Sequence, residues 1–180
     1  FYRTASPSMD ILVSSNLERL LYYESDGDCA KVSGYMRALA KEGRYAIDAD
    51  MLGRIRAVFR ADSSNDEEGF GAIARVFKTY GYLMDTHTAA AWRAAEKLQG
   101  RRPCVVLSTA SPFKFAQSVL FALTGVQESD GFAAMDELAR VSGLAVPSPL
   151  ASLRFARELH TDVINKEDMC AYAMEKAASI

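Results

Sequence analysis

The chain has 180 residues, of which 49% are hydrophobic and 24% charged, and its formal net charge is −2. These values are ordinary for one globular domain with a sizeable core. There is no long basic block and no interleaving of aromatic and basic residues, so we do not expect binding to nucleic acid. No apolar run approaches membrane-spanning length and no signal peptide is evident, so we predict a cytoplasmic protein without membrane contact.

The cysteines and histidines predict neither disulfides nor a metal site. Cys29, Cys104 and Cys170 are far apart and odd in number, and none belongs to a Cys-x-x-Cys pair. The two histidines, His87 and His160, also lack the spacing of metal ligands. We therefore predict a reduced protein that holds no metal.

The first part of the chain predicts amphipathic helices separated by short breaks. Ser14, Ser15 and Asn16 supply capping side chains for a helix that carries three spaced leucines. The same polar residues could instead face a ligand, because a helix start exposes amide groups. Two further helices follow, and Asp48 can cap the second of them. The run 45–47 between these two helices is a weak strand candidate.

An acidic stretch at residues 61–69 predicts the start of another helix rather than a metal site. Its three consecutive acidic residues suit a first turn, where negative charge meets the positive end of the helix dipole. Ser64 and Glu67 have the spacing of a capping box. We expect this helix to end at Gly81.

The next predicted helix begins beside a histidine. Asp85 or Thr86 can cap it, which places His87 in its first turn next to Thr88. A histidine among hydroxyls at a helix start is a candidate site residue, although a local hydrogen-bonding role is the commoner case.

The central stretch predicts a strand, a hydroxyl-rich turn and a helix. Residues 104–107 are wholly apolar and fit a buried parallel strand, although a buried helix is an alternative for so short a run. Pro112 suits a first helical turn and Gly125 a helix end. Ligands of open α/β sheets bind beyond the carboxyl ends of strands, so we expect any small-molecule site at residues 108–114.

Two side chains in this turn suggest chemistry. The Thr109 hydroxyl can hydrogen-bond a neutral ring nitrogen, but it cannot supply the negative charge that keeps a pyridine nitrogen protonated. Lys114 is either a covalent nucleophile or an exposed lysine whose stem covers apolar surface, and we favour the second interpretation. Ser108 and Ser111 lie outside a Gly-x-Ser-x-Gly motif, so they do not predict a hydrolase.

Further helices are predicted to the end of the chain, with one ending at Gly143, a short one after Pro149 and a last one capped by Asn165. Helices therefore dominate. We predict an α/β fold that is rich in helix, with a few short, mainly parallel strands, forming a single compact unit over residues 1–180.

Three stretches of the sequence carry a resemblance to a known family. They are residues 7–11 with 14–19, residues 81–89 and residues 107–115. Together, in this order and spacing, they resemble threonine synthase, a pyridoxal-phosphate enzyme of the tryptophan-synthase-β-like (type II) fold. The resemblance covers most of the chain and implies the C-terminal portion of such an enzyme.

The resemblance also implies a reaction and a cofactor. The family converts O-phospho-L-homoserine and water to L-threonine and phosphate in threonine biosynthesis, using pyridoxal 5'-phosphate. Carried over to this chain, Thr109 is implied to hold the pyridine nitrogen of the cofactor. Possible active-site neighbours without an assigned step are Ser15, Asn16, His87, Thr88, Ser108, Ser111 and Lys114.

The sequence departs from the family at two positions and lacks two of its motifs. Many members have His where this chain has Ser111, and Pro where it has Thr86. The Schiff-base lysine and the glycine-rich phosphate loop belong to the family's N-terminal part, and neither motif appears here. The resemblance thus implies a portion without a catalytic residue of its own, inactive alone, which pairs with the missing portion and can self-associate through an apolar face.

Two alternatives stay open from the sequence alone. One is another type II pyridoxal-phosphate lyase, such as a threonine or serine dehydratase-like enzyme. The other is a non-catalytic α/β binding domain.

Overall fold

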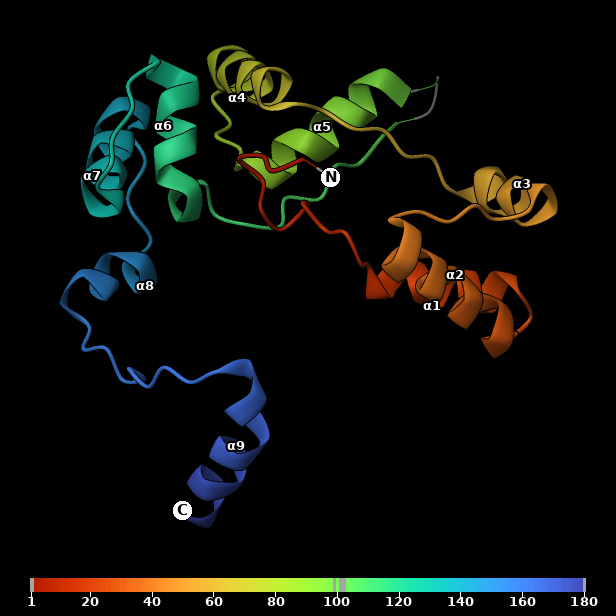
Figure 1. Cartoon of the computed structure of the whole chain (residues 1–180). Helices are drawn as coiled ribbons and strands as arrows, with labels where there is room; N and C mark the ends of the chain where they lie inside the picture. The colour runs from red at the N-terminus through yellow and green to blue at the C-terminus, as the bar shows by residue number, and fades with distance from the viewer. Residues whose placement is uncertain (1, 99, 101–102, 180) are drawn as a thin grey trace. The chain divides into compact units, whose positions relative to one another are not determined.

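The computed structural model describes residues 2–98, 100 and 103–179, and it is drawn in Figure 1. Its regular elements are α1 (Ser15–Glu24), α2 (Cys29–Glu42), α3 (Ala49–Val58), α4 (Asp66–Tyr80), α5 (Thr86–Leu98), η1 (Pro112–Phe115), α6 (Ala116–Thr124), α7 (Gly131–Ser142), α8 (Ser148–Ala151), η2 (Ser152–Phe155), η3 (Lys166–Asp168) and α9 (Met169–Ala178), where η marks a 3-10 helix. Contacts divide the chain into two compact units, Phe1–Val146 and Pro147–Ile180, where the sequence predicted a single one.

Helices α1 to α3 share a small core. Each begins at a side-chain cap, as the sequence predicted for the first and third, with Ser14 capping α1 and Asp48 capping α3. The helices bury one large apolar residue each against the others, namely Leu21, Val32 and Met51. The run 45–47, which was a strand candidate, is loop, because its apolar side chains pack on this core instead of joining a ladder.

Helices α4 to α7 form the second core of the first unit. Helix α4 packs against α5 and α6, and α6 packs against α7. The interior is apolar and includes Ile73, Val76, Val119, Leu120 and Leu138. Three of these helices end at a glycine with positive φ, as expected where only glycine adopts the left-handed conformation at no cost.

The start of α4 lies one residue away from the predicted capping box. Asn65, rather than Ser64, accepts a hydrogen bond from the Glu68 amide at 2.9 Å, and the Glu68 carboxylate accepts from the Asn65 amide at 3.1 Å. The reciprocal geometry is that of a capping box, with asparagine in the place of the usual hydroxyl. Both Ser64 and Asn65 are capping residues by type, so the local pattern left the register open.

Ion pairs join α4 to α5 along their exposed sides. Lys97 lies 3.1 Å from the Glu68 carboxylate, and Arg75 lies 2.8 Å from Glu96. The hydrogen bond from Lys97 holds the pKa of the Glu68 carboxyl below its usual range. Burial opposes a lower pKa at Glu96, but hydrogen bonds from Arg75 and two residues of α5 outweigh it, so this pKa is lowered too.

The predicted few short strands are not confirmed, because the described residues contain no strand. Residues 103–111, green in Figure 1, form a coil before η1. Residues 104–107 are not buried, since Val105 is 83% and Leu107 72% exposed. A strand needs a neighbour for its backbone groups, and nothing among the described residues pairs with this segment. The expectation of a buried strand is therefore wrong for the chain as it stands.

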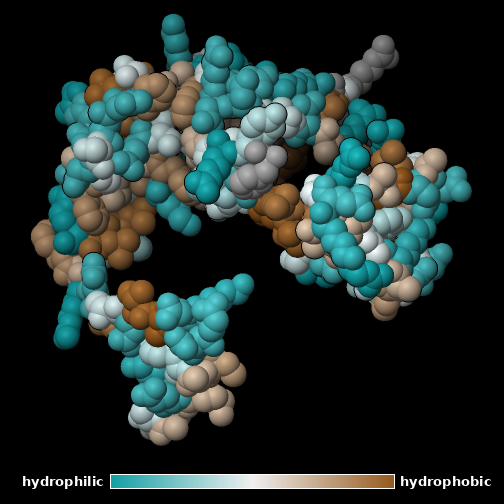
Figure 2. Space-filling view, in the orientation of Figure 1, coloured by the Kyte–Doolittle hydropathy of each residue, from teal (hydrophilic) through white to brown (hydrophobic). Residues whose placement is uncertain are grey.

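The second unit, 147–180, has helices but no buried residue among those described. Its apolar side chains are open to solvent, with Phe155 87% and Val163 95% exposed. On the face drawn in Figure 2, hydrophobic surface lies beside polar surface. Asp162 accepts a hydrogen bond from Tyr172 and lies 3.0 Å from Lys176, which fixes α9 to the preceding loop.

Candidate functional site

The start of α5 is built on one buried carboxylate. Asp85 is 0% exposed, and its Oδ1 accepts hydrogen bonds from the amides of His87 at 2.8 Å and Thr88 at 3.2 Å. Its Oδ2 accepts from the Thr88 hydroxyl. Asp85 is thus the N-cap that the sequence predicted as one of two alternatives, and the helix N-terminus compensates its buried charge.

His87 lies in the first turn of α5 and is 6% exposed. Its Nδ1 is 3.2 Å from Asp85 Oδ1, and its Nε2 accepts a hydrogen bond from the Ser8 amide at 3.1 Å. The imidazole also packs against the ring of Phe115, with the ring centroids 4.5 Å apart. Both nitrogens and one face of the ring are therefore engaged.

Three segments far apart in the sequence meet around α5. The loop at Ser8 reaches His87, and the Thr88 hydroxyl lies 3.5 Å from the Ser108 hydroxyl. The ring of Phe115, at the end of η1, packs against the His87 ring. The fold thus brings together parts of the stretches that carried the resemblance to threonine synthase, namely 7–11, 81–89 and 107–115.

The turn at 108–115 is held by its own backbone and one serine. Ser111 accepts a hydrogen bond from the Phe113 amide at 3.3 Å, and the Lys114 amide donates to the Ser111 carbonyl at 3.0 Å. The hydroxyl of Ser111 thus caps η1. Lys114 is exposed, with its ammonium 5.7 Å from the Phe115 ring centroid. Thr109 is exposed and makes no hydrogen bond within the described part of the chain.

Ser15 and Asn16 are not brought into this group. Both are exposed in the first turn of α1, and the side-chain Oδ1 of Asn16 accepts a hydrogen bond from the Arg19 guanidinium. Across residues 2–98, 100 and 103–179, neither makes a hydrogen bond to His87, Thr88 or the turn at 108–115. In the described structure they are helix-start residues, which was one of the two readings of this stretch.

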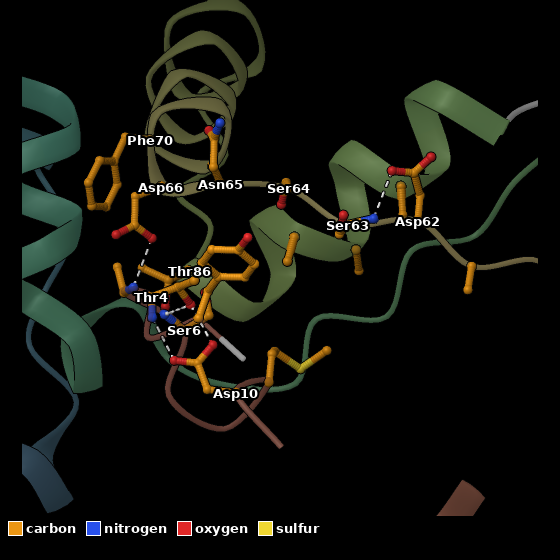
Figure 3. Close-up of a pocket in the computed structure, with 18 of the residues that line it drawn as sticks. Thr4, Ser6, Asp10, Asp62, Ser63, Ser64, Asn65, Asp66, Phe70 and Thr86 are labelled. Atoms are coloured by element: carbon orange, nitrogen blue, oxygen red, sulfur yellow. Dashed lines mark hydrogen bonds between the residues drawn. The ribbon is translucent and has the colours of Figure 1, made fainter. Parts of the chain in front are cut away.

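A cavity of about 560 Å³ lies where the N-terminal loop, the loop before α4 and helix α5 meet (Figure 3). Three aspartates line it, but each has partners. Asp10 accepts from the amide and hydroxyl of Thr4, Asp66 accepts from the Ala5 amide at 2.8 Å, and Asp62 accepts from the Ser63 amide at 2.7 Å. These carboxylates therefore hold loops in place.

Sequence reasoning missed this cavity because its walls come from three separate segments with no shared motif. Residues 61–69 carried a helix-start signal, and residues 9–11 and Thr86 belong to the stretches of the resemblance, but none of these signals indicated a cavity. No group of His, Cys, Asp or Glu in the described ranges has the geometry of a metal site. Within those ranges, no helix is long and apolar enough to cross a membrane.

Comparison with known proteins shows a similarity to one family. The family model described as "Threonine synthase, C-terminal" matches residues 88–167. Threonine synthase of Pseudomonas aeruginosa is 36% identical over 116 residues, or 63% of this chain and 25% of that protein. Threonine synthase of Saccharomyces cerevisiae is 33% identical over 140 residues, or 68% of this chain and 27% of that protein. This chain corresponds to the C-terminal part of the threonine synthases.

Solved threonine synthases share the fold of this region. The structure of pyridoxal-phosphate-bound threonine synthase from Brucella melitensis matches with a TM-score of 0.70 and 37% identity, over 89% of this chain and 31% of that one. Threonine synthase from yeast matches with a TM-score of 0.72 and 25% identity, over 99% of this chain and 37% of that one.

The chain spans only a small share of the curated relatives. It covers 16% of human threonine synthase-like 1, to which it is 34% identical over 122 residues. The match to the C-terminal threonine synthase region favours this family over the dehydratase-like and binding-domain alternatives.

Proposed function

We propose that this chain is the C-terminal part of an enzyme that converts O-phospho-L-homoserine and water to L-threonine and phosphate. In this reaction the bond between the γ-carbon and the phosphate oxygen breaks and inorganic phosphate leaves. The γ-carbon gains a hydrogen, and the β-carbon loses one and takes the hydroxyl group of water. The observation that carries the proposal is the meeting of Ser8, His87, Thr88, Ser108 and Phe115 around the start of α5. The enzyme is proposed to be cytoplasmic.

Pyridoxal phosphate is the proposed cofactor, and Thr109 is its proposed partner in this chain. When bound, the cofactor supplies the electron sink that lets a substrate carbon lose a proton. The exposed hydroxyl of Thr109 has no other hydrogen bond among the described residues, so it fits a role as partner of a ring nitrogen. A neutral hydroxyl would orient that nitrogen without placing a negative charge beside it.

The chain is proposed to supply one wall of the site rather than a whole one. Lys114 is the lysine of the central turn, and its exposed ammonium lies over the Phe115 ring rather than in an enclosed apolar pocket. A lysine activated for covalent catalysis is desolvated or placed next to another cation. We therefore assign the catalytic lysine and the phosphate loop to a missing N-terminal portion, which is the proposed partner of this chain.

The remaining candidates are proposed to shape the wall. Ser111 holds the turn that presents Thr109, and Ser108 joins that turn to Thr88 on α5. Ser15 and Asn16 are proposed as neighbours only in the assembled enzyme. The exposed apolar residues 104–107 are the proposed contact with the missing portion, and without it they would favour self-association.

An assay of the parent enzyme with three substrates tests the proposal. Phosphate release and threonine formation are expected with O-phospho-L-homoserine, and no turnover with threonine or serine. Deamination of threonine or serine without phosphate release from phosphohomoserine would instead identify a dehydratase. The 180-residue chain assayed alone is expected to be inactive. Turnover by it would contradict the proposal that this chain supplies only one wall of the site.

A further inference from the structure

We infer that His87 is a positioning residue. In this role it is a neutral imidazole with its proton on Nδ1, and it holds the loop at Ser8 and the turn at 108–115 against the start of α5. The proposed function does not use this residue in any step, although it is the more buried of the chain's two histidines. Its place is determined by three contacts, one with Asp85 in its own helix start and one each with the loop at Ser8 and with Phe115 of η1.

The location of the proton follows from the Ser8 contact. A backbone amide is always a donor, so the ring nitrogen 3.1 Å from Ser8 N must be an acceptor and cannot carry a proton. The proton of a neutral ring then lies on Nδ1, which is 3.2 Å from a carboxylate oxygen of Asp85. A doubly protonated ring would set two donors against each other at Ser8.

The same contacts show what the ring holds. Ser8 lies 79 residues before His87, and Phe115 lies in η1, so the ring joins both segments to α5. Thr88, the next residue, adds the contact to Ser108 beside Thr109. Removing the imidazole would therefore loosen the turn that presents Thr109 without removing any group proposed to touch the cofactor.

A role in proton transfer does not fit this geometry. Such a residue needs a nitrogen within reach of the reacting proton. Here both nitrogens are occupied by protein partners, and only 6% of the residue is exposed. His87 is therefore a structural link between loops.

Nitrogen NMR of the chain's two imidazoles tests the proton assignment. His160 is exposed, so it serves as an internal control, and a His160→Gln variant assigns the signals. His87 is expected to show one protonated nitrogen, Nδ1, and one unprotonated nitrogen, Nε2. A protonated Nε2 at His87, or a signal averaged over its two nitrogens, would overturn the inference.

Two substitutions then separate the contacts of the ring. The amide of His87→Asn can still donate to Asp85 but does not reach Ser8, whereas the oxygen of His87→Gln can still accept from the Ser8 amide. Hydrogen exchange at Ser8 is expected to rise about tenfold in the asparagine variant, and clearly less in the glutamine variant. The Ala89 amide, which bonds to the Asp85 carbonyl at 3.0 Å, is the control and should be unchanged. Unchanged exchange at Ser8 in both variants would contradict the link.

The inference rests on the proposed function for what the positioned turn does. Neither the imidazole spectrum nor the exchange measurement needs cofactor or substrate. If the threonine synthase assay fails but the imidazole spectrum is as expected, the proposed function is overturned and the role of His87 stands. If the assay succeeds but the spectrum differs, the proposed function stands and the role of His87 is overturned.

Discussion

At the scale of single residues, the start of α5 contains two buried polar groups with opposite surroundings. The Asp85 carboxylate has several hydrogen-bond donors, whereas the Thr86 hydroxyl has no partner among the described residues. Asp85 accepts hydrogen bonds from the amides of His87 and Thr88 and from the Thr88 hydroxyl. Thr86, which lies between Asp85 and His87, is 4% exposed, and its hydroxyl oxygen is buried without a hydrogen-bond partner among the described residues. A buried polar group without a partner costs free energy, so the two threonines of this turn should respond oppositely to loss of their hydroxyls.

Replacing each threonine by valine tests this contrast. Thr86→Val removes an unpartnered hydroxyl and is expected to leave the free energy of unfolding unchanged or to raise it by about 1 kcal/mol. Thr88→Val removes a donor to a buried carboxylate and is expected to lower it by about 1–3 kcal/mol. Urea denaturation of the chain measures both. Destabilisation by Thr86→Val as large as that by Thr88→Val would contradict the assignment.

The link between the motifs is the part of the site that the sequence did not predict. The hydroxyl-rich turn and the histidine at the helix start were both recognised from local patterns. The hydrogen bond from Ser8 to His87 spans 79 residues, and no local pattern contains it. Ser15 and Asn16 show the converse case, because the capping signal of 14–16 was correct, with Ser14 as the cap, but it described only the start of α1.

At the scale of secondary-structure elements, helix boundaries were predictable because caps are local. Gly81, Gly125 and Gly143 end helices in the structure as their places in the sequence indicated. The strand at 104–107 was not predictable in the same way. Whether an extended apolar run becomes a strand depends on a neighbour, and the described residues contain none for it.

The ion pairs between α4 and α5 predict acid sensitivity of this helix pair. The pKa of Glu68 is lowered in the folded chain by its hydrogen bond from Lys97, so its contribution is present above the unfolded pKa of about 4.3. That contribution is lost as pH falls through the lower, folded pKa. Glu68→Gln should therefore reduce the loss of stability at acid pH, while glutamine keeps the capping box.

Glu67→Gln is the matched control for this prediction. Glu67 lies in the same first turn but is exposed, and it makes no ion pair among the described residues. Denaturation midpoints measured from neutral pH down to about pH 3 should depend less on pH in Glu68→Gln than in Glu67→Gln. Equal pH profiles for the two variants would contradict a role for the pair with Lys97.

Because the run at 104–107 is exposed, a substitution there should impair assembly with the N-terminal portion without affecting the stability of this chain. Val105 is 83% exposed, so Val105→Lys should change the free energy of unfolding of the chain by no more than about 0.5 kcal/mol. The same change should abolish capture of the chain by a co-expressed N-terminal portion of the parent enzyme. Val126→Lys, at a residue 58% exposed beyond α6, is the control and should leave capture intact. Capture that survives Val105→Lys would remove this segment from the interface.

At the scale of the whole molecule, the family could be predicted from three short stretches, and the sequence and structure comparisons confirm it. The second unit departs most from the sequence prediction of a single compact unit. Its apolar residues have the spacing of buried positions, yet none of the described ones is buried. Periodicity predicts which side chains favour burial, but it does not say which surface covers them.

The central claim is that this chain holds one wall of a pyridoxal-phosphate site whose catalytic lysine lies elsewhere. The most direct test is to titrate the 180-residue chain with pyridoxal phosphate, reduce it with borohydride and map the labelled peptides. We expect no saturable, stoichiometric label on any one lysine of this chain, and a single label in the parent enzyme on a lysine outside it. One stoichiometric label on Lys114 would contradict the account and make this chain the carrier of the catalytic lysine.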